Sequence, residues 1–435
     1  MSGDVLDDLE ARGLVAHATD RAALRAELSA GPVTFYVGFD PTAPSLHTGS
    51  LVQLLTARRL QLAGHRPLVL VGGATGMIGD PKATGERGLL DKDVVGSWVE
   101  RIRHQVEAFV DFDGDRAARV VNNLDWTSTL STVDFLRDVG RHFPVNRMLA
   151  RDVVRSRLEA GLSYTEFSYV LLQSLDYLEL YRRYGCRLQT GGSDQWGNLT
   201  AGVELVRRAE GAHVHALATP LVTKADGTKY GKTEAGTVWL DPRLTSPYAF
   251  HQFFVQAEDS MAGIYLRLFT FRPPAEIEHL EEATRTRPQE RAAQRTLAHD
   301  VTALVHGEQE AQSAEAAAAA LFGRGELHAL PEPTLAAALT EAGHAVLAAP
   351  AAGEALPSVV DALVATGLVA SRSAGRRTIA EGGAYVNNER VSDPEAAIEA
   401  AMLLHGRWVV LRKGKRSVQG LQLAGPSGTG PSPVV

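Results

Sequence analysis

The sequence predicts an α/β protein in its first half, followed by a helical segment and a small α+β segment. Short apolar runs alternate with helical patterns, and each run ends in a turn rich in glycine or polar residues, which is typical of a parallel sheet. These runs lie at residues 33–37, 67–71, 119–122 and 187–190. Ligands of such sheets gather at the carboxyl ends of the strands, so the turns after these runs are the candidate sites.

The composition is that of an ordinary globular protein, with 435 residues of which 45% are hydrophobic and 22% are charged. No apolar run approaches the roughly 20 residues that a membrane helix needs, and the N-terminus is acidic where a signal peptide would be basic. We therefore expect a cytoplasmic protein with no membrane partner. The single cysteine, Cys186, excludes an intramolecular disulfide and a multi-cysteine zinc site, so we expect no protein-bound metal.

After residue 247 the sequence changes to long segments with the periodicity of helices, which predict a separate all-helical domain. A stretch rich in Ala, Pro and Gly follows and reads as a loosely packed linker. Two short helical patterns and a strand-like run at 384–387 then predict a small third domain, and the Pro, Gly and Ser of the tail predict disorder. The expected parts are residues 1–246, 247–325, 326–354, 355–422 and 423–435.

The turn after the first strand is the most informative candidate site. It reads GFDPTAPSLHTGS over residues 38–50, and a helical pattern follows it. Free backbone N–H groups and the positive end of the helix dipole would favour a polyphosphate there, and Gly49 lets a ligand approach the backbone. His47 and Thr42 could donate to the phosphates. A His-x-Gly match alone is weak evidence, because a histidine before a helix is more often a cap.

Three further motifs follow in order along the chain. Residues 72–81, GGATGMIGDP, follow the second strand, and their glycines would let a substrate approach the backbone. Residues 191–198, GGSDQWGN, open a helix, and their Asp194 could accept from ribose hydroxyls or cap that helix. Residues 224–233, KADGTKYGKT, predict a flexible loop with lysines three apart around a glycine, for which a solvated turn is the simplest alternative.

Together these motifs resemble those of the class I aminoacyl-tRNA synthetases. The first is similar to their HIGH signature, in the form found in bacterial tyrosyl-tRNA synthetases, with Ser50 in place of the second histidine. The lysine loop is similar to their KMSKS loop in its tyrosyl form, KFGKT. Two signatures in order, with the glycine and SDQW motifs between them, argue against coincidence. The resemblance implies a Rossmann-like catalytic domain, a helical anticodon-binding domain and a C-terminal RNA-binding domain of the α-L type.

A row of polar residues on one predicted helix, the polar stripe, indicates which amino acid the protein binds. Helical spacing puts Tyr169, Gln173 and Asp176 on one face among apolar residues, where they would be costly to bury unless a ligand or neighbours satisfied them. The resemblance assigns Asp176 and Tyr36 to the phenol of tyrosine, and Tyr169, Gln173 and Asp80 to its ammonium group. A buried carboxylate and hydroxyl left unpaired would penalise a substrate without its own hydroxyl.

The resemblance also implies a two-step reaction. The tyrosine carboxylate would attack the α-phosphorus of ATP to give tyrosyl-adenylate and pyrophosphate, and tyrosine would then pass to the terminal adenosine of tRNA(Tyr). Mg²⁺ would enter with ATP. The catalytic residues implied are Thr42, His47, Lys82, Arg87, Lys229, Lys232 and Thr233. The further ATP-binding residues implied are Gly38, Asp40, Gly49, Ser50, Gly192 and Asp194. Gln195 is expected to bind the carbonyl end of the adenylate.

RNA binding is predicted from a local basic cluster, because the net charge of −7 argues against a uniformly basic surface. The stretch from Arg407 to Arg416 carries five basic residues and no acidic one, although such a run is often only a solvated face. The predicted RNA-binding residues are Arg372, Arg376, Arg377, Arg412, Lys413, Lys415 and Arg416. The resemblance further implies a homodimer.

Three alternatives stay open at this point. Tryptophanyl-tRNA synthetases share the scaffold but are opposed by Tyr36 together with Asp176. Another HIGH-type nucleotidyltransferase is opposed by the lysine loop and the basic C-terminal segment. An RNA-binding scaffold that has lost catalysis is favoured only by Ser50, because the lysines and carboxylates of the motifs named above are all present.

Overall fold

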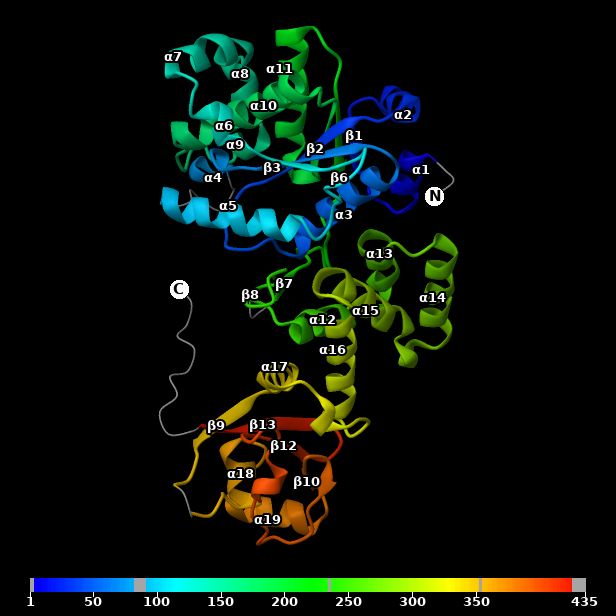
Figure 1. The fold of residues 1–435 in the computed structure, drawn as a ribbon, viewed down its shortest axis with the longest axis vertical. Helices are drawn as coiled ribbons and strands as arrows, with labels where there is room; N and C mark the ends of the chain where they lie inside the picture. The colour runs from blue at the N-terminus through cyan, green and yellow to red at the C-terminus, as the bar shows by residue number, and fades with distance from the viewer. Residues whose placement is uncertain (1–3, 82–90, 234–235, 352–353, 425–435) are drawn as a thin grey trace. The chain divides into compact units, whose positions relative to one another are not determined.

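The computed structural model describes residues 4–81, 91–233, 236–351 and 354–424. It divides into two compact units (Figure 1). The first contains Met1–Leu244 and Glu258–Ala293, and the second contains Thr245–Ala257 and Gln294–Val435. Most of the predicted disordered tail lies outside the described residues, as do Lys82 and Arg87.

A six-stranded sheet in the order β1-β6-β5-β2-β3-β4 organises the first unit. Its strands are β1 (His17–Ala18), β2 (Thr34–Phe39), β3 (Arg66–Val71), β4 (Arg119–Asn122), β5 (Leu188–Gly192) and β6 (His215–Thr219). Strands β2 to β6 are parallel, so the predicted parallel sheet is confirmed, and β1 pairs antiparallel with β6. Strand β6 was not predicted because its sequence, HALAT, is fully buried yet lacks the β-branched and aromatic run that identifies a strand.

Helices cover both faces of this sheet (Figure 1). Helices α10 (Tyr164–Tyr184) and α11 (Trp196–Glu210) pack on one face, and α3 (Thr48–Leu62) and α5 (Lys92–Val106) pack on the other. The connections reverse direction between β2 and β5, and ligands of such sheets bind at this switch point. The other helices of the unit are α1 (Val5–Ala11), α2 (Arg21–Ala30), α4 (Thr75–Ile78), α6 (Leu124–Thr127), α7 (Thr132–Asp134), α8 (Val145–Leu149), α9 (Asp152–Arg155), α13 (Asp259–Phe269) and α14 (Pro274–Thr286).

Helix α10 carries the predicted polar stripe and has well-defined ends. The Ser163 hydroxyl accepts a hydrogen bond from the backbone N–H of Glu166 at 3.2 Å, which caps the N-terminus. Gly185 ends the helix in the left-handed conformation, with φ of 62°. The apolar face of α10 packs on the sheet, with Val170, Leu171 and Leu175 in one core with strand residues of β2 and β3. Tyr169 of the stripe bonds Asp40, the residue after β2, so the stripe reaches the end of the sheet where the motifs lie.

The second unit combines helices with a small sheet in the order β11-β10-β12-β13-β9. Its helices are α12 (Pro247–Val255), α15 (Ala292–His306), α16 (Glu308–Ala320), α17 (Glu332–Ala342), α18 (Val359–Ala365) and α19 (Arg372–Ala380). Its strands are β9 (His344–Ala348), β10 (Ala384–Val386), β11 (Glu389–Arg390), β12 (Trp408–Lys413) and β13 (Ser417–Ala424). Strand β9 is parallel to β13, and the other pairs are antiparallel.

Two boundaries differ from the prediction. Residues 326–354 are not a loosely packed linker, because they contain α17 and β9, and Leu335 and Leu339 are fully buried. The preceding α16 is buried through alanines such as Ala314 and Ala317, a core of small side chains that a search for large apolar residues overlooks. The predicted helical domain is also divided, since α13 and α14 belong to the first unit and α12, α15 and α16 to the second. No helix in the described ranges is long and apolar enough to cross a membrane.

Candidate functional site

The loops after β2 and β3 meet helix α10 at the carboxylate of Asp40. Thr75 donates to Asp40 from Oγ1 to Oδ1 at 2.6 Å, and the Tyr169 hydroxyl donates to Oδ2 at 2.6 Å. A Cβ on Gly72 would lie 2.1 Å from Asp40 Oδ1, so only glycine fits between this carboxylate and the turn. The first motif, the glycine motif and the α10 stripe are thus joined in one place.

A second carboxylate, Asp176, is buried on the same face of α10. It accepts hydrogen bonds from Asn123 Nδ2 at 3.0 Å and from the Trp126 indole N–H at 2.9 Å. Burial raises the pKa of Asp176 to about 8, despite these two donors. Asn123 also donates to Thr75 Oγ1 at 2.9 Å, which ties the two carboxylates into one network.

Asn123, Trp126 and Thr75 were not among the predicted site residues. Asn123 directly follows β4, at the carboxyl end of a strand that the sequence did predict. The rule that ligand groups follow parallel strands would therefore have identified Asn123. Trp126 gave no such signal, because a tryptophan after a strand more often belongs to a core.

Tyr36 reaches this network from β2. Its side chain is buried, and burial together with the nearby Asp176 raises the pKa of its hydroxyl well above the usual value. The hydroxyl has no hydrogen-bond partner among the described residues, and neither has the buried Oε1 of Gln173. Buried polar atoms are nearly always paired, so these two atoms and Asp176 indicate a place for a polar ligand.

A third carboxylate, Asp80, is held by the SDQWGN segment. Gln195 Nε2 donates to Asp80 Oδ2 at 2.8 Å, and Asn198 Nδ2 donates to Oδ1 at 3.2 Å. Arg151 donates in turn to Asn198 Oδ1. Burial raises the pKa of Asp80. Burial raises the pKa of the Tyr169 hydroxyl well above its usual value, and the carboxyl groups of Asp40 and Asp80 raise it further, so this part of the site suits an ammonium group.

The phosphate side of the predicted site is more exposed. His47 caps α3, and its Nδ1 accepts from the Gly49 N–H at 3.0 Å, so this histidine has the capping role that is common for a histidine before a helix. His47 and Gly49 are exposed at the start of the 15-residue helix α3, and Thr42 is exposed in the turn before it. Ser50 is half-buried, and its N–H donates to His47 O at 2.8 Å. This is the helix end that favours an anion.

The lysine loop lies directly against that helix end. The N–H of Thr48 donates to Val238 O at 3.1 Å, and the N–H of Val238 donates to Gly231 O at 2.9 Å. Gly231 has φ of 91°, and a Cβ there would lie 2.0 Å from Thr48 Oγ1. The first motif and the lysine loop therefore lie in contact.

The remaining predicted residues lie in the lysine loop and on or just after strands β2 and β5. Lys229 is exposed and pairs in a β-bridge with Thr223. Lys232 and Thr233 form the short strand β7 (Lys232–Thr233), which pairs with β8 (Gly236–Thr237), but their side chains lie outside the described part of the chain. Gly38 lies on β2, Gly192 ends β5, and the exposed Asp194 does not cap α11.

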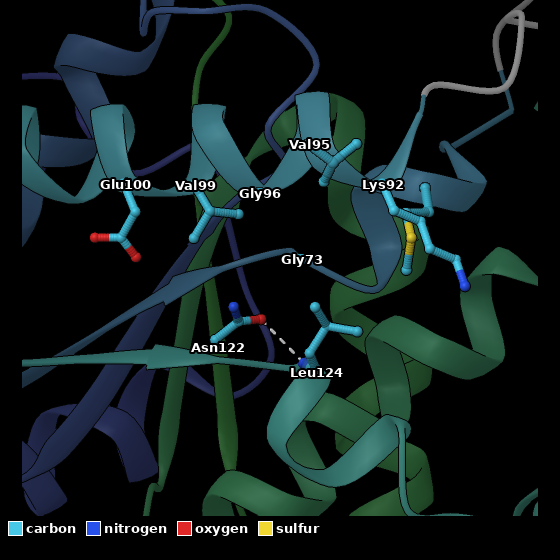
Figure 2. Close-up of a pocket in the computed structure, with 9 residues that line it drawn as sticks. Gly73, Lys92, Val95, Gly96, Val99, Glu100, Asn122 and Leu124 are labelled. Atoms are coloured by element: carbon cyan, nitrogen blue, oxygen red, sulfur yellow. Dashed lines mark hydrogen bonds between the residues drawn. The ribbon is translucent and has the colours of Figure 1, made fainter.

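A cavity of about 260 Å³ lies between α5 and the ends of β3 and β4 (Figure 2). Gly73, Met77, Lys92, Val99 and Glu100 are among its lining residues. None of the residues predicted to bind tyrosine or ATP lines this cavity, so we do not assign it to the site. No group of three or more His, Cys, Asp or Glu in the described ranges is arranged to hold a metal ion.

The predicted RNA-binding residues lie on α19 and on the β12–β13 hairpin of the second unit. Arg377, Lys413, Lys415 and Arg416 are exposed. Arg372 pairs with Asp361 at 2.6 Å and Arg376 with Glu395 at 3.1 Å. Arg412 is buried, and its guanidinium stacks on Tyr385 at 4.8 Å from the ring centre. This burial contradicts the prediction that Arg412 is available to RNA: the sequence did not show that its β12 position faces the core.

Comparison with known proteins agrees with this geometry. Residues 28–323 match the family described as tRNA synthetases class I (W and Y), and residues 347–419 match the tyrosine–tRNA ligase SYY-like C-terminal domain. A tyrosine–tRNA ligase of Kineococcus radiotolerans is 61% identical over 95% of this chain and 97% of its own length. One of Streptomyces coelicolor is 59% identical over 97% of this chain and 99% of its own length.

A solved structure supports the same family assignment. A C-terminally truncated mitochondrial tyrosyl-tRNA synthetase of Aspergillus nidulans aligns with a TM-score of 0.65 and 30% identity, over 72% of this chain and 92% of that chain. The described part of the chain also has the HIGH-type turn and the lysine loop in contact at the switch point of its sheet. The chain therefore belongs to the class I tRNA synthetases, within the tyrosine–tRNA ligase family.

Proposed function

We propose that this protein activates L-tyrosine with ATP, giving tyrosyl-adenylate and pyrophosphate, and then transfers tyrosine to the terminal adenosine of tRNA(Tyr). The observation that carries the proposal is the pair formed by Asp176 and Tyr36. A buried carboxyl group and a buried hydroxyl without a partner among the described residues suit the phenol of tyrosine, which both donates and accepts.

The other end of tyrosine has a matching set of groups. We assign its ammonium group to Tyr169, Gln173 and Asp80, which lie beside the carboxyl network described above. Gln195, which bonds Asp80 at 2.8 Å, would bind the carbonyl end of the adenylate. The carboxyl groups of Asp40 and Asp80 beside Tyr169 favour the ammonium of a free amino acid.

ATP is assigned to the turn between β2 and α3. Thr42 and His47 would bind its phosphates at the helix N-terminus, where Gly49 has no side chain to hold a ligand away from the backbone. Lys229, Lys232 and Thr233 of the lysine loop, with Lys82 and Arg87, would close over the pyrophosphate. Gly38, Asp40, Ser50, Gly192 and Asp194 would bind the rest of the nucleotide. Mg²⁺ enters as the ATP complex.

The proposed activation step needs no general acid–base catalyst. The tyrosine carboxylate is already ionised at neutral pH, so it needs no general base to attack the α-phosphorus. The rate must come from aligning the carboxylate with the phosphorus and from cations placed where negative charge grows. This division assigns orientation to the carboxyl network and charge stabilisation to the lysine loop.

The test is tyrosine-dependent exchange of labelled pyrophosphate into ATP. Exchange with tyrosine and none with tryptophan is expected. Exchange driven by tryptophan would contradict the assignment of Tyr36 and Asp176. No exchange with either amino acid, together with retained tRNA binding, would favour the non-catalytic RNA-binding scaffold.

We further propose a cytoplasmic homodimer that binds tRNA through the exposed basic residues of α19 and the β12–β13 hairpin. The tRNA substrate of the proposed reaction supports the compartment. A run of exposed apolar side chains between α7 and α10 supports the dimer: Val133, Leu136, Val145, Leu149, Leu158 and Tyr164, which are 38–71% exposed. Analytical ultracentrifugation of Leu136→Glu beside the wild type tests this, and a dimeric wild type with a monomeric variant is expected.

A further inference from the structure

An arginine is fully buried under the far end of the helix that begins at the phosphate site. Arg59 lies in the last turn of α3, and its side chain is 0% exposed. Arginine is almost never fully buried unless its charge is paired. The reason for this burial is a contact with a segment far away in the sequence.

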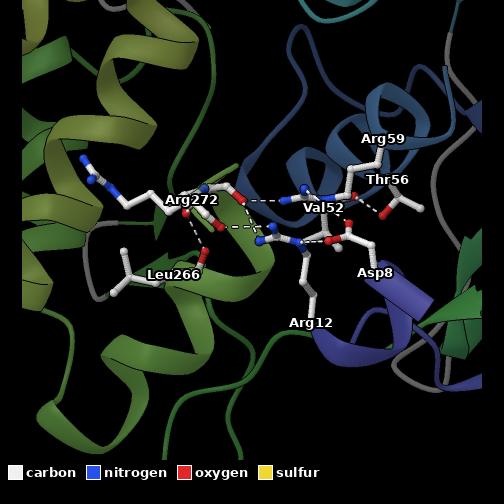
Figure 3. Close-up of polar contacts among 8 residues, drawn as sticks. Asp8, Arg12, Val52, Thr56, Arg59, Leu266 and Arg272 are labelled. Atoms are coloured by element: carbon white, nitrogen blue, oxygen red, sulfur yellow. Dashed lines mark hydrogen bonds and ion pairs between the residues drawn. The ribbon is translucent and has the colours of Figure 1, made fainter. Parts of the chain in front are cut away.

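Arg59 and Arg12 together terminate helix α13 (Figure 3). Arg59 donates from Nη2 to the carbonyl oxygen of Thr270, the residue that ends α13. Arg12, which directly follows α1, donates to the same oxygen at 3.3 Å and to Arg272 O at 3.0 Å. Asp8 pairs with Arg12 at 2.9 Å and lies 3.8 Å from Arg59 Nη1.

The charges of this junction suit a helix end but are costly to bury. Two guanidinium groups and one carboxylate leave an excess positive charge, which the negative end of the α13 dipole offsets. Burial and the neighbouring Arg12 lower the pKa of Arg59 to about 9. Its Nε and Nη1 have no hydrogen-bond partner among the described residues. A well-packed apolar side chain would often be as stable or more so, so stability alone does not explain Arg59.

Helix α13 also holds the lysine loop. The Tyr265 hydroxyl donates to Thr223 O at 2.8 Å. The ring of Tyr265 lies 4.1 Å from the ring of Tyr230, the residue before Gly231, and the ring of Phe269 lies 6.1 Å from it. The lysine loop is therefore joined to α3 twice, directly at the start of the helix through Gly231 and Thr48, and indirectly at its end through α13 and Arg59.

We propose that Arg59 is a positioning residue for tyrosine activation, which clamps the end of α13 to α3 and so sets the lysine loop over the phosphate site. The inference rests on the proposed function and deepens it. Arg59 lies at the opposite end of α3 from the phosphates and acts only through α13 and the loop. A misplacement of a catalytic group by about 1 Å can cost about 100-fold in rate, so loss of the clamp should be visible in the chemical step.

The first measurement is the kinetics of tyrosine-dependent pyrophosphate exchange by Arg59→Lys. Lysine keeps the charge but loses the planar fork that reaches the helix end. We expect kcat to fall about 10-fold while KM for tyrosine changes less than about 2-fold. The matched control is Arg58→Lys, because Arg58 is the adjacent residue, is 26% exposed and pairs with Asp111 at 2.6 Å. The control should leave both constants near the wild-type values.

The second measurement separates positioning from general destabilisation by a double-mutant cycle with Lys229→Ala. If Arg59 acts through the lysine loop, the loss caused by Arg59→Lys should shrink to less than about 2-fold once Lys229 is removed. Additive losses would overturn the inference, as would a rise in KM for tyrosine equal to the fall in kcat.

A milder variant keeps the test decisive if Arg59→Lys does not fold. Tyr265→Phe removes only the hydroxyl that bonds Thr223, and the same kcat-selective loss and the same coupling to Lys229 are expected. Additive behaviour of this variant would equally overturn the inference. A wild type without tyrosine-dependent exchange would instead overturn the proposed function, so the two failures are distinguishable.

Discussion

The tyrosine side and the phosphate side of the candidate site are built differently. On the tyrosine side, Asp176, Tyr36 and Tyr169 are buried, and the partners of Asp176 and Tyr169 directly follow strands of the sheet: Asn123 follows β4 and Asp40 follows β2. On the phosphate side, Thr42, His47 and Lys229 are exposed on turns. If the proposed assignment holds, the groups that select the amino acid are already in place in the fold, whereas ATP must gather the exposed groups that stabilise its charge.

Replacing Asp176 by Ala should break the tyrosine side most severely. The substrate phenol would lose a hydrogen bond to a carboxyl group, and Asn123 and Trp126 would lose their acceptor, so a fall in kcat/KM for tyrosine of about 100-fold or more is expected. Pyrophosphate exchange measures it. Ser174→Ala is the control, because Ser174 is buried on the same helix and its hydroxyl donates within that helix, to Val170 O. Full activity in Asp176→Ala would show that another helix selects the substrate.

Replacing Lys232 by Ala should break the phosphate side with a different signature. A cation that acts on charge developing in the transition state changes rate and leaves ground-state binding alone, so adenylate formation should slow by about 100-fold. Single-turnover kinetics measure the rate, and equilibrium dialysis measures tyrosine affinity, which should stay near the wild-type value. A loss confined to tyrosine affinity would contradict the comparison between the two sides.

Replacing Tyr36 by Phe should sharpen the comparison through opposite effects on binding and stability. The hydroxyl is buried without a partner among the described residues, so its removal should leave thermal stability unchanged or raise it. The loss of one neutral hydrogen bond to the phenol should raise KM for tyrosine by about 10-fold. A variant that is destabilised but binds tyrosine normally would assign Tyr36 to the core instead.

The smallest effect is expected from the basic hairpin of the second unit. Lys415→Ala combined with Arg416→Ala should weaken tRNA binding several-fold and reduce its salt dependence, because each lost phosphate contact lowers the slope of log K against log salt by about 0.7 to 0.9. Filter binding at several salt concentrations measures both. Pyrophosphate exchange needs no tRNA and should be unaffected. An unchanged salt slope would assign these residues to a solvated face.

The site residues that belong to short sequence motifs could be predicted, whereas those that depend on distant contacts could not. The residues of the HIGH-type turn, the lysine loop and the α10 stripe stand in contiguous motifs, and the contact between Gly231 and Thr48 confirms that the first two lie together. Asn123 could have been found from its place after a predicted strand. Trp126 could not, and neither could the burial of Arg412, because the sequence does not show which side of a turn or strand will be covered.

The sequence by itself determined the parallel sheet, the order of the motifs and the chemistry of their side chains, because helix and strand periods and glycine turns act over a few neighbouring residues. Only the tertiary structure decided how distant segments share one site. Arg59 bonds Thr270 across 211 positions, and Tyr169 bonds Asp40 across 129. Such contacts depend on how the sheet and its helices pack, and no local pattern of residues records that packing.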